Sequence, residues 1–210
     1  MRLTRVLIAV LALSVSSAVC HADNFSFTGS FTGLNDVQLF TFTVGASSDV
    51  TLRSYGYAGG VNAAGQTIAE GGFDPILALF QGTGPSAIKI GQNDDGGGNV
   101  PADSVTGVHY DTYLHLTSLA AGDYTVSIQD YANFANGPTL GDGFSNGGLT
   151  GGTFIDATGH NRTGNWAFDV LGVESASTPP TSPVPEPSSL MLLGTGLAGL
   201  VTGVRRRIKL

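Results

Sequence analysis

Residues 123–131 read DYTVSIQDY, and residues 39–44 read LFTFTV. In the first segment Tyr124, Val126 and Ile128 alternate with polar residues, and in the second Phe and Val alternate with threonine. An alternation with a period of two is typical of a β-strand that has one buried face and one solvent-facing face. The two segments therefore predict strands that share an apolar core.

Five further segments have the length and composition of short strands, and clusters of Gly, Asn and Asp separate most of them. They are DVTLRSY (49–55), PILALF (75–80), AIKIGQ (87–92), HYDTYLHL (109–116) and NWAFDVLGV (165–173). No helical period of useful length precedes the C-terminal segment, and the sequence has no tandem repeat of fixed period. About eight short alternating strands are typical of an antiparallel, jelly-roll-like β-sandwich, so we expect an all-β fold.

Residues 1–22 have the order of a secretory signal peptide. An apolar run follows Arg2 and Arg5, and small residues continue to Ala22. This order predicts export by the Sec route and cleavage after Ala22. Because Cys20 is the only cysteine and lies inside this segment, we expect the mature chain to fold without a disulfide.

The C-terminal segment combines an apolar run with a basic end. Residues 188–204 carry no charge and would rise about 26 Å as a helix, near the lower limit for crossing a hydrocarbon core of about 30 Å. We therefore expect one transmembrane helix over 188–204 and a basic cytoplasmic tail over 205–210. The basic cluster that would keep this tail in the cytoplasm comprises Arg205, Arg206, Arg207 and Lys209.

A proline-rich linker, residues 176–187, separates the membrane segment from the predicted sandwich, residues 23–175. Proline favours an extended backbone, which is the conformation in which proteases bind their substrates. The linker ends in the triplet Pro185, Glu186, Pro187. Together with the apolar run and the basic cluster, this triplet resembles the PEP-CTERM sorting signal of Gram-negative bacteria that make exopolysaccharide.

This resemblance implies recognition by exosortase, a membrane-embedded, transpeptidase-like enzyme that removes the helix near the Pro-Glu-Pro triplet. It also implies a transient stay in the inner membrane, followed by delivery to the cell surface or to the extracellular matrix of a biofilm. The alternative is an ordinary single-pass anchor that is not cut. An intact Leu210 in the mature protein is expected only for that anchor.

The charge of the predicted exported body is strongly negative. Residues 23–178 hold fifteen of the sixteen carboxylates but only three of the nine Lys and Arg residues, which gives a net charge of −12. Such a surface repels nucleic acids and anionic lipid headgroups, and it favours cations and neutral or basic partners. We therefore exclude nucleic-acid binding.

Several segments of the body resemble the pre-peptidase C-terminal-like β-sandwich. They are DVQLFTFTV (36–44), GGFDPILALF (71–80), NDDGGG (93–98), DTYLHLTSLAAGDYTVSIQDY (111–131) and NWAFDV (165–170). The resemblance implies a non-catalytic accessory or adhesive module, sometimes assisted by calcium, and it names no ligand. The first segment has Gln38 where the family usually has a second acid, which weakens any cation site carried over to Asp36.

The segment QNDDGGGN offers the best candidate for a bound ion. Asn93, Asp94 and Asp95 concentrate carboxylate and amide oxygens in a flexible turn, which suits a hard cation such as calcium. If PILALF and AIKIGQ pair as a hairpin, the hairpin returns this turn to Asp74. The alternative is a solvated acidic turn without an ion.

Two other patterns suggest chemistry only weakly. On a strand, His109 and Asp111 would lie on one face and near enough to share a metal, whereas His115 would lie roughly 20 Å from His109. Ser145 stands in the spelling G-x-S-x-G, but glycine-rich sequence flanks it where a hydrolase needs a strand and a helix. We therefore expect no enzymatic activity.

Aromatic residues raise a second functional class. Trp166 and four tyrosines without an obvious place in the core could stack on sugar rings; the tyrosines are Tyr55, Tyr57, Tyr113 and Tyr131. The sequence thus predicts a non-catalytic protein of the cell surface or matrix, and the alternative is an exopolysaccharide-binding module of the same fold.

Overall fold

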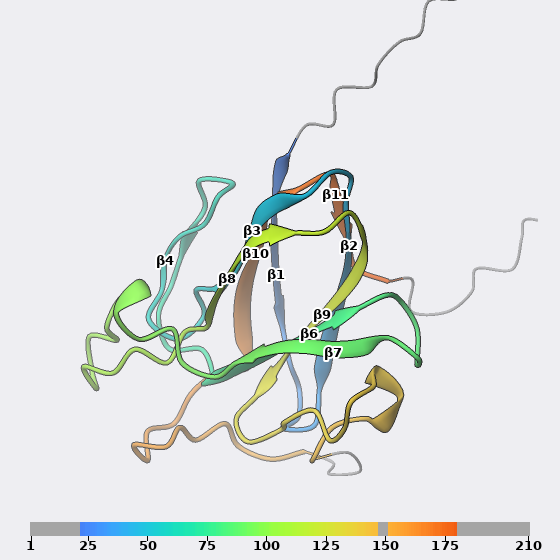
Figure 1. Cartoon of the computed structure of the whole chain (residues 1–210). Coiled ribbons are helices and arrows are strands. Elements are labelled where there is room, and N and C mark those ends of the chain that lie inside the picture. Colours follow the sequence, from blue (N-terminus) through green and yellow to red (C-terminus); the bar gives the residue numbers. More distant parts are fainter. Residues whose placement is uncertain (1–21, 147–150, 180–210) are drawn as a thin grey trace, which may run out of the picture. The chain divides into compact units, whose positions relative to one another are not determined.

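The structure is a computed structural model of the chain, and it describes residues 22–146 and 151–179 (Figure 1). The chain divides into a unit over residues 1–176, which holds the sandwich, and a second unit over residues 177–210. The predicted transmembrane helix and basic tail lie outside the described residues, as does the predicted signal peptide except for Ala22. Within the described ranges no helix is long and apolar enough to cross a membrane.

Two antiparallel sheets form the body, as the sequence predicted. The first sheet contains, in spatial order, β1 (Asp23–Ser30), β10 (Asn165–Val173), β3 (Ser48–Ser54) and β8 (Tyr113–Leu119). The second contains β11 (Ser175–Ser177), β2 (Val37–Val44), β9 (Gly122–Asp130), β6 (Pro75–Gln81) and β7 (Ile88–Asn93). A small separate hairpin is made by β4 (Gly60–Val61) and β5 (Thr67–Ile68).

The eight long strands pair in a nested order. The first long strand, β1, pairs with the last, β10; β2 pairs with β9, β3 with β8, and the middle two, β6 and β7, form a hairpin. Successive strands from β1 to β3 therefore alternate between the two sheets, as Figure 1 shows. This nesting is the jelly-roll arrangement, and it confirms the predicted fold class.

The core lies between the sheets and is rich in aromatic rings. Phe40 of β2 is fully buried, and its ring centroid lies 5.1 Å from that of Phe168 and 4.7 Å from that of Phe27, both in the opposite sheet. The Trp166 ring meets Phe40 edge-on at 5.7 Å. The alternating Phe and Val side chains of LFTFTV thus close the sandwich, as their period indicated.

All seven segments predicted as strands contain strands, with one important difference in bounds. The segment HYDTYLHL becomes a strand only at Tyr113, so His109 and Asp111 precede β8. The sequence analysis did not name β1, although Phe25 and Phe27 alternate with polar residues there. The last strand, β11, runs to Ser177, past the predicted boundary at residue 175.

The register of the strands defines two ends of the sandwich. At one end, which we call the terminal end, Asp23 of β1 pairs with Val173 of β10, and the Glu174 amide donates to the Thr43 carbonyl at the end of β2. At the other end, which we call the loop end, β1 leads into β2, β6 begins and β7 and β9 end. The strand β1 therefore begins at the terminal end, where β10 ends.

We expect Phe40→Ala to lower the free energy of unfolding by about 3–5 kcal/mol, because the change leaves a cavity where three rings meet. The control Val61→Ala, at a side chain that is 61% exposed, should stay within about 0.5 kcal/mol of the wild type. Urea denaturation of the exported body measures both. A loss at Phe40 no larger than that at Val61 would contradict the proposed core.

Candidate cation site

The hairpin of β6 and β7 brings the predicted acidic residues together at the loop end. Asp74 immediately precedes β6, and Asp94 and Asp95 immediately follow β7. One carboxylate oxygen of each of the three residues lies within 4.8 Å of the others. Two oxygens bound to the same calcium ion at about 2.4 Å cannot be more than about 4.8 Å apart, so this spacing suits a shared ion.

Asp74 supplies the buried side of the cluster. Its residue exposure is 4%, and its Oδ1 atom has no hydrogen-bond partner among the described residues. The Oδ1 atom of Asp94 is also buried without a partner, whereas Asp95 is exposed. A buried carboxylate without a donor is costly, and a cation between these residues would remove that cost.

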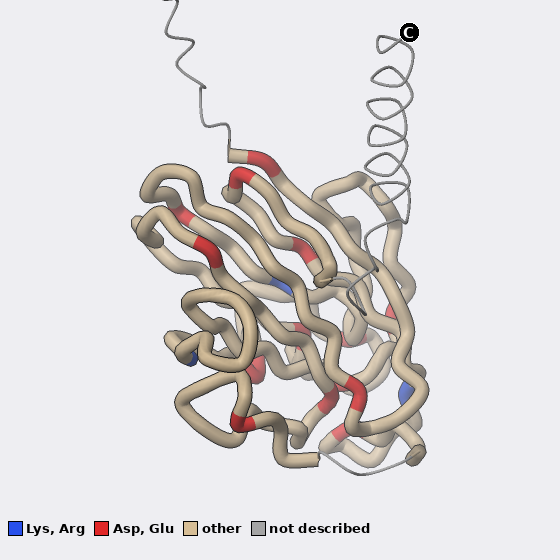
Figure 2. The backbone as a smooth tube through the Cα atoms, turned by 90° about the vertical axis from the view of Figure 1, so that its right-hand side faces the viewer, with Lys and Arg blue, Asp and Glu red and all other residues tan. Residues whose placement is uncertain are grey.

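The electrostatics of the cluster show how poorly the protein itself compensates these charges. Burial and, to a smaller extent, the negative charges of Asp95 and Asp94 together raise the pKa of Asp74 to about 8. Burial and the charge of Asp95 raise the pKa of Asp94 to about 6. Figure 2 shows how few Lys and Arg residues stand among the Asp and Glu residues of the described chain.

Glycine allows the chain to turn tightly after Asp95. A Cβ atom at Gly96 would lie 2.7 Å from the Asp111 carbonyl oxygen and 2.7 Å from Val100 Cγ1, so a side chain does not fit there. Gly97 has a φ of +53°, in the region that glycine adopts without strain. The glycine run therefore holds Asp94 and Asp95 in a defined turn, where the sequence suggested only flexibility.

The fourth predicted ligand, Asn93, hydrogen-bonds within the fold. Its Oδ1 atom accepts from the Tyr113 amide at 2.8 Å, and its Nδ2 atom donates to the Asp95 carbonyl at 3.1 Å. Asn93 thus ties the turn to β8. The cluster as built contains Asp74, Asp94 and Asp95, all with hard oxygen donors of the kind that calcium prefers.

The structure also places the weaker candidates of the sequence analysis. Asp36 accepts from the amides of Thr32 and Gly33, at 2.6 and 3.0 Å, and so stabilises a turn. Asp111 is fully buried and accepts from Ser54 Oγ and from the amides of residues 57 and 58.

The proposed strand-face pairing of His109 with Asp111 is therefore wrong. The Nδ1 atom of His109 lies 2.7 Å from the Val100 carbonyl oxygen, and that of His115 lies 2.9 Å from Thr51 Oγ1. Asp111 is occupied by three donors inside the fold instead of sharing a metal with His109.

Ser145 lies in a turn without a following helix among the residues that the structure describes. Its hydroxyl donates to the Phe134 carbonyl at 2.9 Å and lies 3.2 Å from Asn136 Oδ1. Neither contact activates a nucleophile, because neither a backbone carbonyl oxygen nor a carboxamide oxygen is a general base that takes the proton of the serine hydroxyl. The serine serves to close its loop.

Sequence reasoning missed a buried ionic network at the loop end. Arg162, whose side chain is 4% exposed, donates to Asp156 at 2.6 Å and to Asp103 at 3.0 and 3.1 Å. It also donates to the Tyr57 hydroxyl at 2.7 Å. One signal in the sequence could have indicated this network. Arg162 is one of only three Lys and Arg residues in the body, and it stands in a glycine-rich segment, so a specific ionic role could be expected for it.

This network differs from the cation site because its charges are compensated. Hydrogen bonds from Arg162 lower the pKa of Asp103 to about 2. Burial would raise the pKa of Asp156, but hydrogen bonds from Thr158, His160, Arg162 and Tyr57 together lower it. The network joins loop segments far apart in sequence, and its role is structural.

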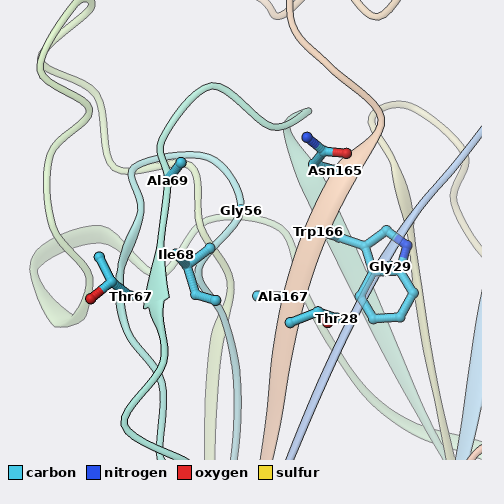
Figure 3. Close-up of a pocket in the computed structure, with 9 residues that line it drawn as sticks. All are labelled: Thr28, Gly29, Gly56, Thr67, Ile68, Ala69, Asn165, Trp166 and Ala167. Carbon is cyan, nitrogen blue, oxygen red and sulfur yellow. The ribbon is translucent and has the colours of Figure 1, made fainter.

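Most aromatic candidates for sugar binding lie inside the protein. Trp166, Tyr55 and Tyr57 are 8%, 6% and 0% exposed. A pocket of about 320 Å³ lies beside Trp166, and Figure 3 shows the indole ring against Gly29 of β1, with Ile68 across the pocket. The ring packs among core residues, so little of it is left for a sugar to stack on.

The comparisons with known proteins address the C-terminal segment. The model of the PEP-CTERM protein-sorting motif matches residues 183–207, which include the Pro-Glu-Pro triplet and the three arginines. The predicted resemblance is thereby confirmed, although the matched segment lies outside the described residues. The motif marks the chain as an exported protein that exosortase, a membrane enzyme, sorts to the cell surface.

One solved structure similar to this chain is the pre-peptidase C-terminal domain of a collagenase from Bacillus anthracis. It is 10% identical, the alignment covers 73% of this chain and 89% of that chain, and the TM-score is 0.32. No curated protein matches the chain.

We expect opposite effects of Asp74→Asn with and without calcium. With a chelator, the variant should be at least as stable as the wild type, because it removes a costly buried carboxylate. At calcium about 100-fold above the Kd, the wild type should gain about 5–10 °C in Tm and the variant little. Differential scanning calorimetry of the exported body measures all four values.

The matched control is Glu174→Gln, which removes one exposed charge at the terminal end. It should keep the full calcium-induced rise in Tm. Equal rises in wild type and Asp74→Asn, or no rise in the wild type, would contradict the site.

We also expect acid to unfold the protein through the Arg162 network. The pKa of Asp103 is lower in the folded protein, about 2, than its ordinary value of 3.8, so the unfolded chain binds more protons as the pH falls. Its contribution to stability is present above about pH 4 and is lost as the pH drops toward 2. Arg162→Gln should move the midpoint of acid unfolding to higher pH, as followed by the fluorescence of Trp166, the single tryptophan. An unchanged midpoint would contradict the role assigned to the network.

Proposed function

We propose that this protein is a non-catalytic component of the cell surface or extracellular matrix, and that calcium stabilises its β-sandwich. The observation that carries the calcium role is the pair of buried, unpartnered oxygens of Asp74 and Asp94 within one acidic cluster. The proposed route is Sec export, a transient stay in the inner membrane and removal of the C-terminal helix, and the sorting motif and the signal-like N-terminus support it.

The chemistry of the cluster supports binding and not catalysis. Its three members are all carboxylates, and calcium in such a site acts by joining chain segments. Here it would fasten the start of β6 to the turn after β7, at the loop end. Extracellular calcium sites of this kind work at ion concentrations of about 10⁻⁴–10⁻³ M, so a weak site suffices outside the cell.

The alternative, an exopolysaccharide-binding module, was suggested by five aromatic residues, and most of them are not available to a ligand. Three of the five aromatic residues that suggested it are buried, and they are Trp166, Tyr55 and Tyr57. Of the other two, Tyr131 is 45% exposed and Tyr113 is partly exposed.

Sequencing both termini of the mature protein by mass spectrometry tests the proposed route. We expect a mature N-terminus at Asp23 and a C-terminus at or near residues 185–187, without the segment 188–210. Replacing the triplet by Ala-Ala-Ala should leave the chain uncut and the protein in the inner membrane fraction. Wild-type protein that ends in Leu210 and stays in that fraction would show an ordinary anchor and contradict the proposal.

A further inference from the structure

We propose that the cluster of Asp74, Asp94 and Asp95 and the neighbouring tyrosines Tyr110 and Tyr131 form a calcium-dependent site for glycans. The inference rests on the proposed calcium role and adds a ligand to it. A sugar with adjacent oxygens would complete the coordination of the ion, and its C–H face would pack on a tyrosine ring.

The ion site is open on one side. Asp74 is buried and closes the protein side, whereas Asp95 is exposed and Asp94 is partly exposed. Calcium takes six to eight oxygen ligands. Three carboxylates supply at most six oxygens, and only if each of them binds through both of its oxygens. Asn93 already donates and accepts within the fold. Oxygens from outside the protein must therefore occupy the open positions of the ion.

Tyr131 follows Asp130 at the end of β9, where its backbone meets that of Asp74. Its amide donates to the Asp74 carbonyl at 2.8 Å, which fixes its backbone to the cluster. Its side chain is 45% exposed, and Phe134 meets its ring edge-on at a centroid distance of 5.8 Å. An exposed ring held by a neighbouring ring loses little entropy on binding, which favours it as a contact surface.

Tyr110 precedes Asp111, whose backbone lies against the turn of the cluster. The Gly96 amide, directly after Asp95, donates to the Asp111 carbonyl at 2.8 Å. The Tyr110 ring packs on the buried Tyr57 ring at 5.2 Å. Tyr110 is therefore next to the segment that meets the Asp95 turn, and a buried ring holds its side chain.

The chemistry of this surface selects a sugar over other ligands. With an uncompensated acidic cluster at its centre, the surface binds oxygen donors only through a cation. A sugar offers adjacent hydroxyl or carboxylate oxygens for the ion and an apolar C–H face for a ring. The site also lies at the loop end, opposite the terminal end at which β1 begins.

The test is an array of neutral and uronic-acid oligosaccharides probed with the exported body, in millimolar calcium, in magnesium and with a chelator. We expect binding in calcium that is lost with the chelator and that is weakened up to about tenfold by Tyr131→Ala. Tyr131→Phe, which keeps the ring, should bind more strongly than Tyr131→Ala. Ile88→Ala, at a 58% exposed side chain at the far end of β7, should bind as the wild type does.

A calcium titration of Tm run beside the array separates the two proposals. If calcium raises Tm but no oligosaccharide binds, or binding survives the chelator, the glycan site is wrong and the calcium role stands. If calcium leaves the wild-type Tm unchanged, both are wrong. Should Tyr131→Ala fail to fold, the calcium dependence of wild-type binding still decides the question.

Discussion

The contact between aromatic rings of the two sheets is the interaction on which the rest of the structure depends. Phe40 of β2 projects from one sheet and meets Phe27, Phe168 and Trp166 of the other, while Phe42 stacks on Tyr124 of its own sheet. The only cysteine, Cys20, lies in the predicted signal peptide, so burial of these rings replaces the cross-links on which many small exported domains rely. The same packing fixes where each strand ends, and thereby which loop residues meet.

Much of the fold could be predicted because its strands alternate apolar and polar residues. The burial of LFTFTV follows this alternation, whereas in DYTVSIQDY the polar residues Thr125, Ser127 and Gln129 are buried as well, so the solvent-facing side expected for that strand was wrong. The alternation fails at HYDTYLHL, where His109 to Thr112 form no strand and Asp111 turns inward to accept three hydrogen bonds. A polar residue that is buried as a hydrogen-bond acceptor does not follow the alternation of polar and apolar residues. The sequence alone therefore could not distinguish Asp111 from a surface residue.

The sequence predicted the three carboxylates of the candidate site, but not the hydrogen bonds and neighbouring residues around them. The hairpin argument placed Asp74 beside Asp94 and Asp95, and the structure confirms that these three meet. Sequence reasoning had no means of assigning Asn93 to Tyr113, because that bond joins positions separated by a whole loop. Tyr110 and the Arg162 network depend in the same way on loop contacts that only the folded chain creates.

Two acidic clusters at the loop end illustrate how the protein treats buried charge. Asp103 and Asp156 surround Arg162 and are neutralised by it, so their pKa values fall. No Lys or Arg of the described ranges forms an ion pair with Asp74 or Asp94, and their pKa values rise instead. In a body with only three Lys and Arg residues, a metal ion is the natural counter-charge for the second cluster.

A crystal structure of the exported body grown with calcium tests this claim most directly. The account predicts an anomalous density peak among the three carboxylates, with oxygens of Asp74, Asp94 and Asp95 at about 2.3–2.6 Å from it. A map without a peak there, with Asp74 and Asp94 hydrogen-bonded to each other as a protonated pair, would contradict it.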